Sequence, residues 1–376
     1  MADVLEFRGL FPIHQEFAYF NHAAISPLNT RVAGAMRDYL EITQRAPFEH
    51  WPAQLSGAVG SMKERAAQLI GAANPSEIVP MANTAAGINT AAQSLPLRAG
   101  DNVLVLDGDY PAVIYPWLNL APRGVLVKWV PQVQGGLDLE VLRARVDSRT
   151  RVIAISTAMF ATGFRNDIAA VGALCQERGI FLVVDAIQTL GAFPIDVRAC
   201  HIDFLSCGGQ KWLLATPGSG FLYCRQELIE SLQLGAYVGT TSTVDAANYL
   251  DYNFTLLPTA ERFNLGTPNL PGIVGLDAAL GLILEAGPAR IAERVLALTD
   301  LLIAGLQDRG YQVRSNLDPA HRSGIVIVEV PEPEAARLKL LEAGVITSVR
   351  GGGLRVSPHF YNLEEEVRRV GAELAG

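Results

Sequence analysis

The chain has 376 residues, of which 49% are hydrophobic, and a formal net charge of -8 at pH 7. This length allows one large domain and a smaller one around a sizeable core. The acidic balance and the lack of any Lys/Arg cluster argue against nucleic-acid binding, which normally needs a basic face. A small-molecule ligand is therefore expected.

The N-terminal stretch "MADVLEFRGLFPIHQ" has no basic start followed by a long apolar run, and no window of about 18 uninterrupted apolar residues occurs. Neither a signal peptide nor a membrane span is predicted, and the cytoplasm is the expected location. The cysteines include no C-x-x-C pair and lie in apolar surroundings; they are Cys175, Cys200, Cys207 and Cys224. Reduced, buried thiols are expected in place of disulfides or metal ligands.

From about residue 100, short apolar runs alternate with stretches of helical periodicity. The candidate strands are 102–107, 125–130, 151–156, 180–185, 202–206 and 220–224. Most are apolar on both faces, which is typical of a sheet covered on both sides. The segment 166–179 has apolar spacings of three and four and ends at Gly179, which predicts a helix. An α/β core with a mostly parallel sheet follows.

After about residue 255 the pattern changes to a second, α+β unit. A loop at 264–272 leads into a helix candidate, and further elements follow at 273–287, 324–330, 334–344, 354–358 and 362–376. The expected domains are a large one at 21–255 and a small C-terminal one at 256–376. Residues 1–20 are expected to associate with the small domain.

Two polar residues follow apolar strands where ligands of open α/β sheets gather. Asp185 ends the run 180–185, and Lys211 follows the run 202–206 after a glycine-rich stretch. They are expected to converge on one crevice. Among the four lysines, Lys63 and Lys339 fit polar helix faces and Lys128 fits an alternating strand, so Lys211 alone lies in a loop.

A lysine among apolar groups loses its preference for the charged form and becomes a nucleophile able to form Schiff bases. An ionised aspartate at a strand end suits a protonated pyridine nitrogen that acts as an electron sink. Together, Lys211 and Asp185 suggest pyridoxal phosphate. The alternative from these residues alone is a buried salt bridge, or a Lys211 that lies apart in solvent.

Six motifs in order resemble the class V aminotransferase family, pyridoxal-phosphate enzymes of fold type I that include cysteine desulfurase-like and isopenicillin N epimerase-like proteins. They are "YFNHAAISPL", "NTAAGIN", "VVDAIQ", "GGQKWLLATPGSGFLY", "NLGTPN" and "LRVSPHFYN". The resemblance covers nearly the whole chain. It implies a mostly parallel, seven-stranded sheet flanked by helices, with a smaller α+β C-terminal domain.

By this resemblance, Lys211 carries the cofactor as a Schiff base and Asp185 pairs with the pyridinium nitrogen. Gln188 corresponds to a glutamine that hydrogen-bonds the ring hydroxyl, although it could be a plain polar residue at a helix start. Tyr110 stands where the family stacks a ring on the cofactor; by itself an aromatic there favours packing.

The resemblance also implies a phosphate cradle at a helix start, where free amides and the helix dipole attract anions. It consists of Thr84 and the backbone amides of Ala85 and Ala86, with N-capping by Thr84 as the alternative. Thr267, in "NLGTPN", resembles the residue that reaches the cofactor of a partner subunit, which implies a homodimer. Taken alone, that segment is a turn.

For the substrate, Arg355 resembles the arginine that binds the α-carboxylate, a task suited to a planar fork of donors. Arg350 is the competing candidate, and a surface arginine is the alternative. His22, His50 and Trp51 are further candidates to line the substrate pocket; for a lone histidine, a structural role is the alternative.

Three positions depart from the family pattern. Gln210 precedes the lysine where histidine is common, and Gly208 stands where relatives often offer a hydroxyl to the phosphate. Ser206 and Gln210 are the candidate substitutes. Phe160 occupies a position where many relatives have an asparagine near the ring oxygen.

The region 345–358 contains no cysteine, whereas cysteine desulfurases of this family carry a nucleophilic one on a loop there. A persulfide-forming desulfurase is therefore disfavoured, and a transaminase, a carbon-sulfur or other β/γ lyase without a thiol, and an epimerase-like enzyme remain. A nicotinamide dehydrogenase lacks its G-x-G-x-x-G, and no hydrolase motif occurs. A non-catalytic protein that keeps the fold is the remaining rival.

Overall fold

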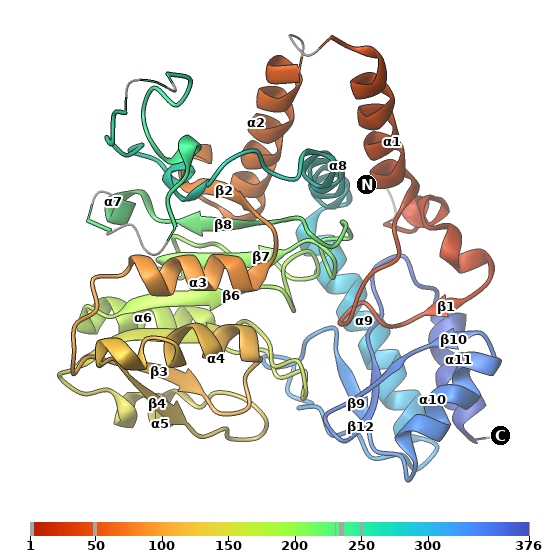
Figure 1. Ribbon diagram of the computed structural model, residues 1–376. Coiled ribbons are helices and arrows are strands. Elements are labelled where there is room, and N and C mark those ends of the chain that lie inside the picture. Colours follow the sequence, from red (N-terminus) through yellow and green to blue (C-terminus); the bar gives the residue numbers. More distant parts are fainter. Residues whose placement is uncertain are drawn as a thin grey trace.

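The structure is a computed structural model that describes residues 4–47, 51–229, 231–232, 237–248, 250 and 252–375, with the backbone alone for 51–56. Its centre is a seven-stranded sheet with the order β2-β8-β7-β6-β5-β3-β4 (Figure 1). The strands are β2 (Ile78–Met81), β3 (Asn102–Leu106), β4 (Leu126–Val130), β5 (Thr150–Ser156), β6 (Phe181–Asp185), β7 (Phe204–Gly208) and β8 (Gly220–Cys224). Strand β8 runs antiparallel to β2 and β7, and the other neighbours pair in parallel. The predicted α/β fold with a mostly parallel sheet is confirmed.

Both faces of the inner strands of this sheet are buried, because their successive side chains enter different cores, whereas the edge strand β4 is partly exposed. Leu104 and Leu106 belong to one apolar cluster, whereas Val103 and Val105 belong to another. Helices on both sides of the sheet complete these cores: α3 (Thr84–Ser94), α4 (Pro111–Leu118), α5 (Leu139–Arg145) and α6 (Ile168–Arg178). This double cover explains why the strands are continuously apolar in sequence.

Helix α6 shows how the sequence sets an element's ends. Its N-cap is Asp167, whose side chain accepts a hydrogen bond from the amide of Ala170 at 3.0 Å. It stops at Gly179, which adopts a left-handed conformation with φ of 63°. The predicted helix at 166–179 is therefore confirmed.

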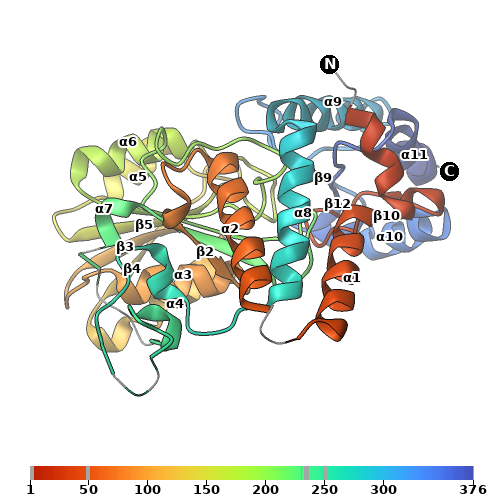
Figure 2. The ribbon, with the colours of Figure 1, turned by 90° about the horizontal axis from the view of Figure 1, so that it is seen from above.

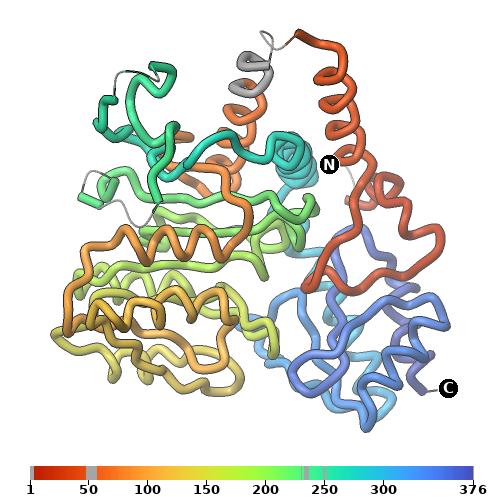
Figure 3. The backbone as a smooth tube through the Cα atoms, viewed as in Figure 1, coloured from red at the N-terminus to blue at the C-terminus, as the bar shows by residue number. Residues whose placement is uncertain are grey.

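A second unit contains a three-stranded antiparallel sheet with the order β11-β12-β9. Its elements are β9 (Val326–Val328), β11 (Ser348–Arg350), β12 (Gly353–Val356), α9 (Pro288–Gln307), α10 (Pro333–Glu342) and α11 (Glu364–Ala375). Strand β1 (Ala18–Tyr19) pairs in parallel with β10 (Val345–Ile346), so the N-terminal segment lies against this unit (Figure 3). Helix α9 was not among the elements predicted from the sequence.

Helix α8 (Leu270–Ala286) packs against α1 (Thr30–Arg45) and α2 (Trp51–Ile70), as Figure 2 shows. A short α7 (Gln226–Ile229) follows β8. Within the described residues, no single helix has the length and apolar character to cross a membrane. The pair α8 and α9, bent by 78°, meets that test when both are taken together.

Candidate active site

A cavity of about 340 Å³ lies at the carboxyl ends of β6 and β7. Asp185 and Lys211 both line it, so the two residues singled out in the sequence share one crevice. The charged side chains of its described lining are these two and the arginines Arg350 and Arg355. Three cations and one carboxylate therefore face the same space.

Asp185 is 1% exposed and ends β6. Its Oδ1 accepts a hydrogen bond from the amide of Ile187 at 2.8 Å, while its buried Oδ2 has no partner in the described part of the chain. Burial raises the pKa of this carboxyl to about 7, although the Ile187 amide and Lys211 act in the opposite direction. A buried acceptor without a donor is the partner that a protonated ring nitrogen requires.

Lys211 follows β7 in a loop that lines this cavity, and burial lowers the pKa of its amine to about 8. The charge of Asp185 raises that pKa, and the charges of Arg355 and Arg350 lower it further. The Nζ lies 5.6 Å from the centroid of the Tyr110 ring. At a pKa of about 8, about a tenth of the amine is neutral, and hence nucleophilic, at pH 7.

The first turn of α3 borders the cavity through Asn83, Thr84 and Ala85. Its N-cap is Asn83, whose Oδ1 accepts from the amide of Ala86 at 2.9 Å. The alternative of capping by Thr84 is therefore wrong, while the Ala86 amide bonds to Asn83 and its role for a phosphate stays a prediction. Asparagine is among the strongest N-cap residues, so "MANTAA" contained the signal for Asn83.

Thr84 joins α3 to β7. Its Oγ1 accepts from the amide of Gly208 at 2.9 Å, and its carbonyl accepts from the hydroxyl of Ser206 at 3.0 Å. The two elements are so close that a Cβ on Gly87 would lie 2.2 Å from the Ser206 Oγ. Ser206 thus holds the helix on the strand and does not line the cavity, which corrects its candidacy as a phosphate ligand.

Gln210 does line the cavity. Its Oε1 is buried without a partner among the described residues, and a Cβ on Gly208 would lie 2.6 Å from it. The side chain of Gln210 therefore fills the space that the Cβ of a larger residue at position 208 would need. Ser206 and Gln210 were the two candidates to replace the hydroxyl that is missing at position 208. Of these, Gln210 lines the cavity, and no described residue bonds its side-chain oxygen.

Gln188 lines the same cavity and is fixed from two sides. Its Nε2 donates to the carbonyl of Ala23 at 3.2 Å, and its Oε1 accepts from the indole Nε1 of Trp212 at 3.2 Å. Because these bonds assign the amide's orientation, one N–H of Gln188 remains for a ligand. Trp212 was not predicted as a site residue, and its position beside Lys211 gave no signal.

Tyr110 and Phe160 form one wall of the cavity. Their ring centroids are 5.2 Å apart at 79°, an edge-to-face contact. Tyr110 is 44% exposed, so the protein leaves part of this side chain uncovered.

The two arginines come from the hairpin of β11 and β12. Arg355 is 2% exposed; its Nε donates to the Ser348 hydroxyl at 3.2 Å and its Nη1 to the carbonyl of Phe160 at 3.3 Å. Burial, with the nearby charge of Arg350, lowers the pKa of Arg355 to about 10. Arg350 is exposed at the rim and donates to the carbonyl of Val349 at 2.8 Å.

His22 does not line the cavity, which corrects that prediction. It is fully buried, with Nδ1 2.8 Å from the carbonyl of Ser357 and Nε2 2.9 Å from the Tyr361 hydroxyl. Both ring nitrogens are therefore occupied by the core, and burial lowers its pKa well below the usual range. His50 and the side chain of Trp51 lie outside the described residues.

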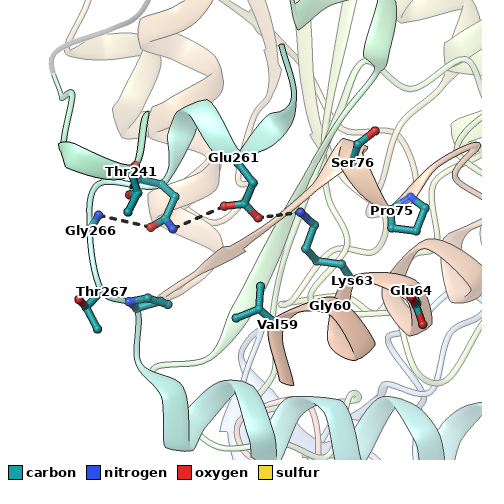
Figure 4. Close-up of a pocket in the computed structure, with 12 residues that line it drawn as sticks. Val59, Gly60, Lys63, Glu64, Pro75, Ser76, Thr241, Glu261, Gly266 and Thr267 are labelled. Atoms are coloured by element: carbon teal, nitrogen blue, oxygen red, sulfur yellow. Dashed lines mark hydrogen bonds and ion pairs between the residues drawn. The ribbon is translucent and has the colours of Figure 1, made fainter. Parts of the chain in front are cut away.

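Thr267 lines a different, larger cavity of about 520 Å³ (Figure 4). There Lys63 and Glu261 form an ion pair at 2.7 Å, and Asn264 links Glu261 to the amide of Gly266. Within this chain, Thr267 and Lys211 thus line different cavities. The smaller cavity is the candidate active site, because it holds the unpartnered Asp185 oxygen and the amine of lowered pKa.

All four cysteines are free thiols. Cys175, Cys207 and Cys224 are buried and Cys200 is half-buried, and none of them lines the 340 Å³ cavity.

The model of the family described as aminotransferase class V matches residues 18–370. The uncharacterized aminotransferase YcbU of Bacillus subtilis is 29% identical over 372 residues, 98% of this chain and 97% of that protein. A probable cysteine desulfurase of Methanothermobacter thermautotrophicus is also 29% identical, over 96% of this chain and 95% of its own. Among solved structures, the apo cysteine desulfurase of Thermococcus onnurineus NA1 superposes with a TM-score of 0.91 at 23% identity, covering 100% of this chain and 98% of that one.

The fold and the cavity define a pyridoxal-phosphate enzyme of fold type I. The chain belongs to the class V aminotransferase family. The donor set suits this cofactor: an acceptor without a partner for a ring nitrogen, an amine of lowered pKa, and a helix N-terminus for a phosphate.

Proposed function

We propose that the protein converts a small α-amino acid by a reaction that begins with loss of the α-proton and needs no thiol nucleophile. Transamination and carbon-sulfur or β-elimination are the two outcomes that fit. The observation that carries this proposal is the shared cavity of Lys211, the unpartnered Oδ2 of Asp185 and the buried Arg355.

In this proposal Lys211 binds the cofactor covalently and Asp185 pairs with its ring nitrogen. Thr84 and Ala85 receive the phosphate at the start of α3, with Gln210 as an added amide donor. Gln188 donates to the ring oxygen and Tyr110 covers the ring. Pyridoxal phosphate, when bound, supplies the conjugated ring that takes up the electron pair left at the α-carbon.

Arg355 holds the α-carboxylate of the substrate through Nη2, which has no hydrogen bond in the described part of the chain. Its other two nitrogens are anchored by Ser348 and Phe160, so the guanidinium is oriented before the substrate arrives. The Nζ of Lys211 is the base that accepts the α-proton, a role that suits an amine with a pKa of about 8.

The hairpin argues against a desulfurase mechanism. Strands β11 and β12 are joined directly by Gly351 and Gly352, with φ of 61° and 74°, so no loop bearing a cysteine separates them. A Cβ on Gly351 would lie 1.9 Å from the carbonyl of Ala161, which fixes the turn against the cavity wall. A nucleophilic thiol therefore has no place on this hairpin.

We also propose that the enzyme is a homodimer in which Thr267 reaches the partner's cofactor. Large apolar side chains are exposed in the stretch of chain that precedes it: Tyr237, Val238, Leu250, Tyr252, Phe254 and Leu265. A second copy covering them would remove this surface from water. Sedimentation velocity tests it, and a monomer at micromolar concentration with bound cofactor would refute it.

The reaction is tested by mixing the cofactor-loaded enzyme with a panel of amino acids, with and without keto acids. Accumulation of pyridoxamine phosphate indicates transamination, and release of ammonia with a keto acid indicates elimination. Inversion at the α-carbon without either product would favour the epimerase-like alternative. If no amino acid reacts or perturbs the cofactor's spectrum, the proposal is wrong.

A further inference from the structure

The cavity holds two guanidinium groups on one face of one hairpin. Ser348 pairs with Arg355 across the strands, and Arg350 pairs with Gly353. Since alternate residues of a strand share a face, Arg350 and Arg355 lie on the same side as diagonal neighbours. The residue directly opposite Arg350 is Gly353, so no side chain faces Arg350 across the hairpin.

Nothing in the described part of the chain neutralises this pair. Arg355 donates to a hydroxyl and a carbonyl, and Arg350 donates to its neighbour's carbonyl. Neither arginine forms an ion pair with a described carboxylate, and their mutual repulsion contributes to the lowered pKa of Arg355. Uncompensated like charges in a cavity are a feature of sites that bind a counter-charged ligand.

The other charges of the cavity are already assigned by the proposed function. Asp185 faces the cofactor ring, Lys211 carries the cofactor, and the helix α3 receives its phosphate. One α-carboxylate satisfies the buried Arg355. Arg350, at the rim and with Nε and Nη2 uncommitted among the described residues, is left without an anion.

We infer that the substrate is an acidic α-amino acid, whose side chain ends in a second small oxyanion such as a carboxylate. This inference rests on the proposed function. Arg355 binds the α-carboxylate in the interior, and Arg350 binds the distal oxyanion near the mouth of the cavity. The planar fork of each guanidinium suits both groups.

The inference is tested by spectral titration of the cofactor-loaded enzyme with L-glutamate, L-aspartate and their near-isosteric amides. We expect at least one acidic amino acid to bind roughly tenfold or more tightly than its amide, as expected for a desolvated charge pair. Arg350→Gln should reduce this acid-to-amide ratio about tenfold, and Arg350→Lys should retain part of it. Arg149→Gln, which removes an exposed arginine outside the cavity, is the matched control.

A second readout uses the protein without cofactor. At constant ionic strength, succinate should raise its melting temperature more than acetate does, and Arg350→Gln should remove the difference. Amides that bind as tightly as acids, or an Arg350→Gln variant that weakens both classes equally, would overturn the inference while the proposed function stands. If no amino acid changes the spectrum, the proposed function itself fails.

Discussion

The indole Nε1 of Trp212 donates to the Oε1 of Gln188 across 3.2 Å inside the protein core. Trp212 is fully buried and immediately follows Lys211 in sequence. Because this bond turns the amide oxygen toward Trp212 and only one N–H of Nε2 is used by Ala23, Gln188 has a second N–H to donate to the cavity. The residue that follows Lys211 in sequence therefore sets which group Gln188 presents to the cavity.

Replacing Trp212 by phenylalanine should leave the Gln188 oxygen buried without a donor, at a cost of about 1–3 kcal/mol in folding stability. It should also shift the pH at which the bound cofactor changes its absorbance, because Gln188 is free to rotate. Trp117→Phe is the matched control, since Trp117 is equally buried but its Nε1 has no described partner. Equal denaturant midpoints and equal spectra for the two variants would contradict the role of Trp212.

Asp185 should make the cofactor-free protein less stable as pH rises. Its folded pKa is about 7 against a reference value of 3.8, so the stabilisation from the proton it binds is fully present below about pH 4. That stabilisation is lost as pH rises through 7, by roughly 4 kcal/mol in total. Asp185→Asn should flatten this part of the stability curve while weakening cofactor binding at least tenfold. Urea unfolding of both proteins between pH 4 and 8 measures how the free energy of unfolding changes with pH. The same pH dependence in the parent and in Asp185→Asn would disprove the role of Asp185.

His359 should make the protein less stable as pH falls. Burial lowers its pKa to about 4, and its Nδ1 accepts from the amide of Phe360 at 2.8 Å, which a protonated ring cannot do. Its contribution is present above about pH 6.5 and is lost as pH falls toward 4, by roughly 3 kcal/mol. In an Asp185→Asn background, His359→Gln should reduce the acid sensitivity measured by urea unfolding. A variant as acid-sensitive as its parent would show that His359 is not neutral in the core.

The turn that joins β11 and β12 should tolerate no side chain at position 351. Gly351→Ala combines a left-handed backbone with the close carbonyl of Ala161, so a loss of more than about 2 kcal/mol is expected. Gly310→Ala is the control, because Gly310 has φ of 82° with open space around it and should cost about 1 kcal/mol. Gly351→Ala should also raise the dissociation constant for amino acids by displacing Arg350 and Arg355. Similar melting temperatures for the two variants would be evidence against a fixed turn.

Much of the fold followed from local patterns in the sequence. All six strands expected between residues 102 and 224 are present, because continuous apolar runs have few alternatives in an α/β chain. Strand β2 was not predicted; it is four residues long and contains Pro80, which is unusual inside a sheet. Its place beside β8 depends on pairing between distant segments, which no local pattern encodes.

Site residues could be predicted where the local sequence indicates their chemistry. They could not be predicted where packing against distant segments determines the role of a side chain. Asp185 and Lys211 stood out because they follow apolar strands at the edge where ligands of open α/β sheets gather, and they do share the cavity. Ser206 and His22 were further candidates by residue type, but contacts with Thr84 and Tyr361 commit them to the core. Those partners lie more than 100 residues away, so their contacts could only be read from the structure.

The most direct measurement is to reduce the cofactor-loaded protein with borohydride, digest it and locate the modified residue by mass spectrometry. We expect one phosphopyridoxyl group per chain, on the peptide that contains Lys211, with bleaching of the visible absorbance band. A label on Lys63, Lys128 or Lys339, or no label on a folded protein saturated with the vitamer, would contradict the assignment of Lys211 as the cofactor-binding lysine.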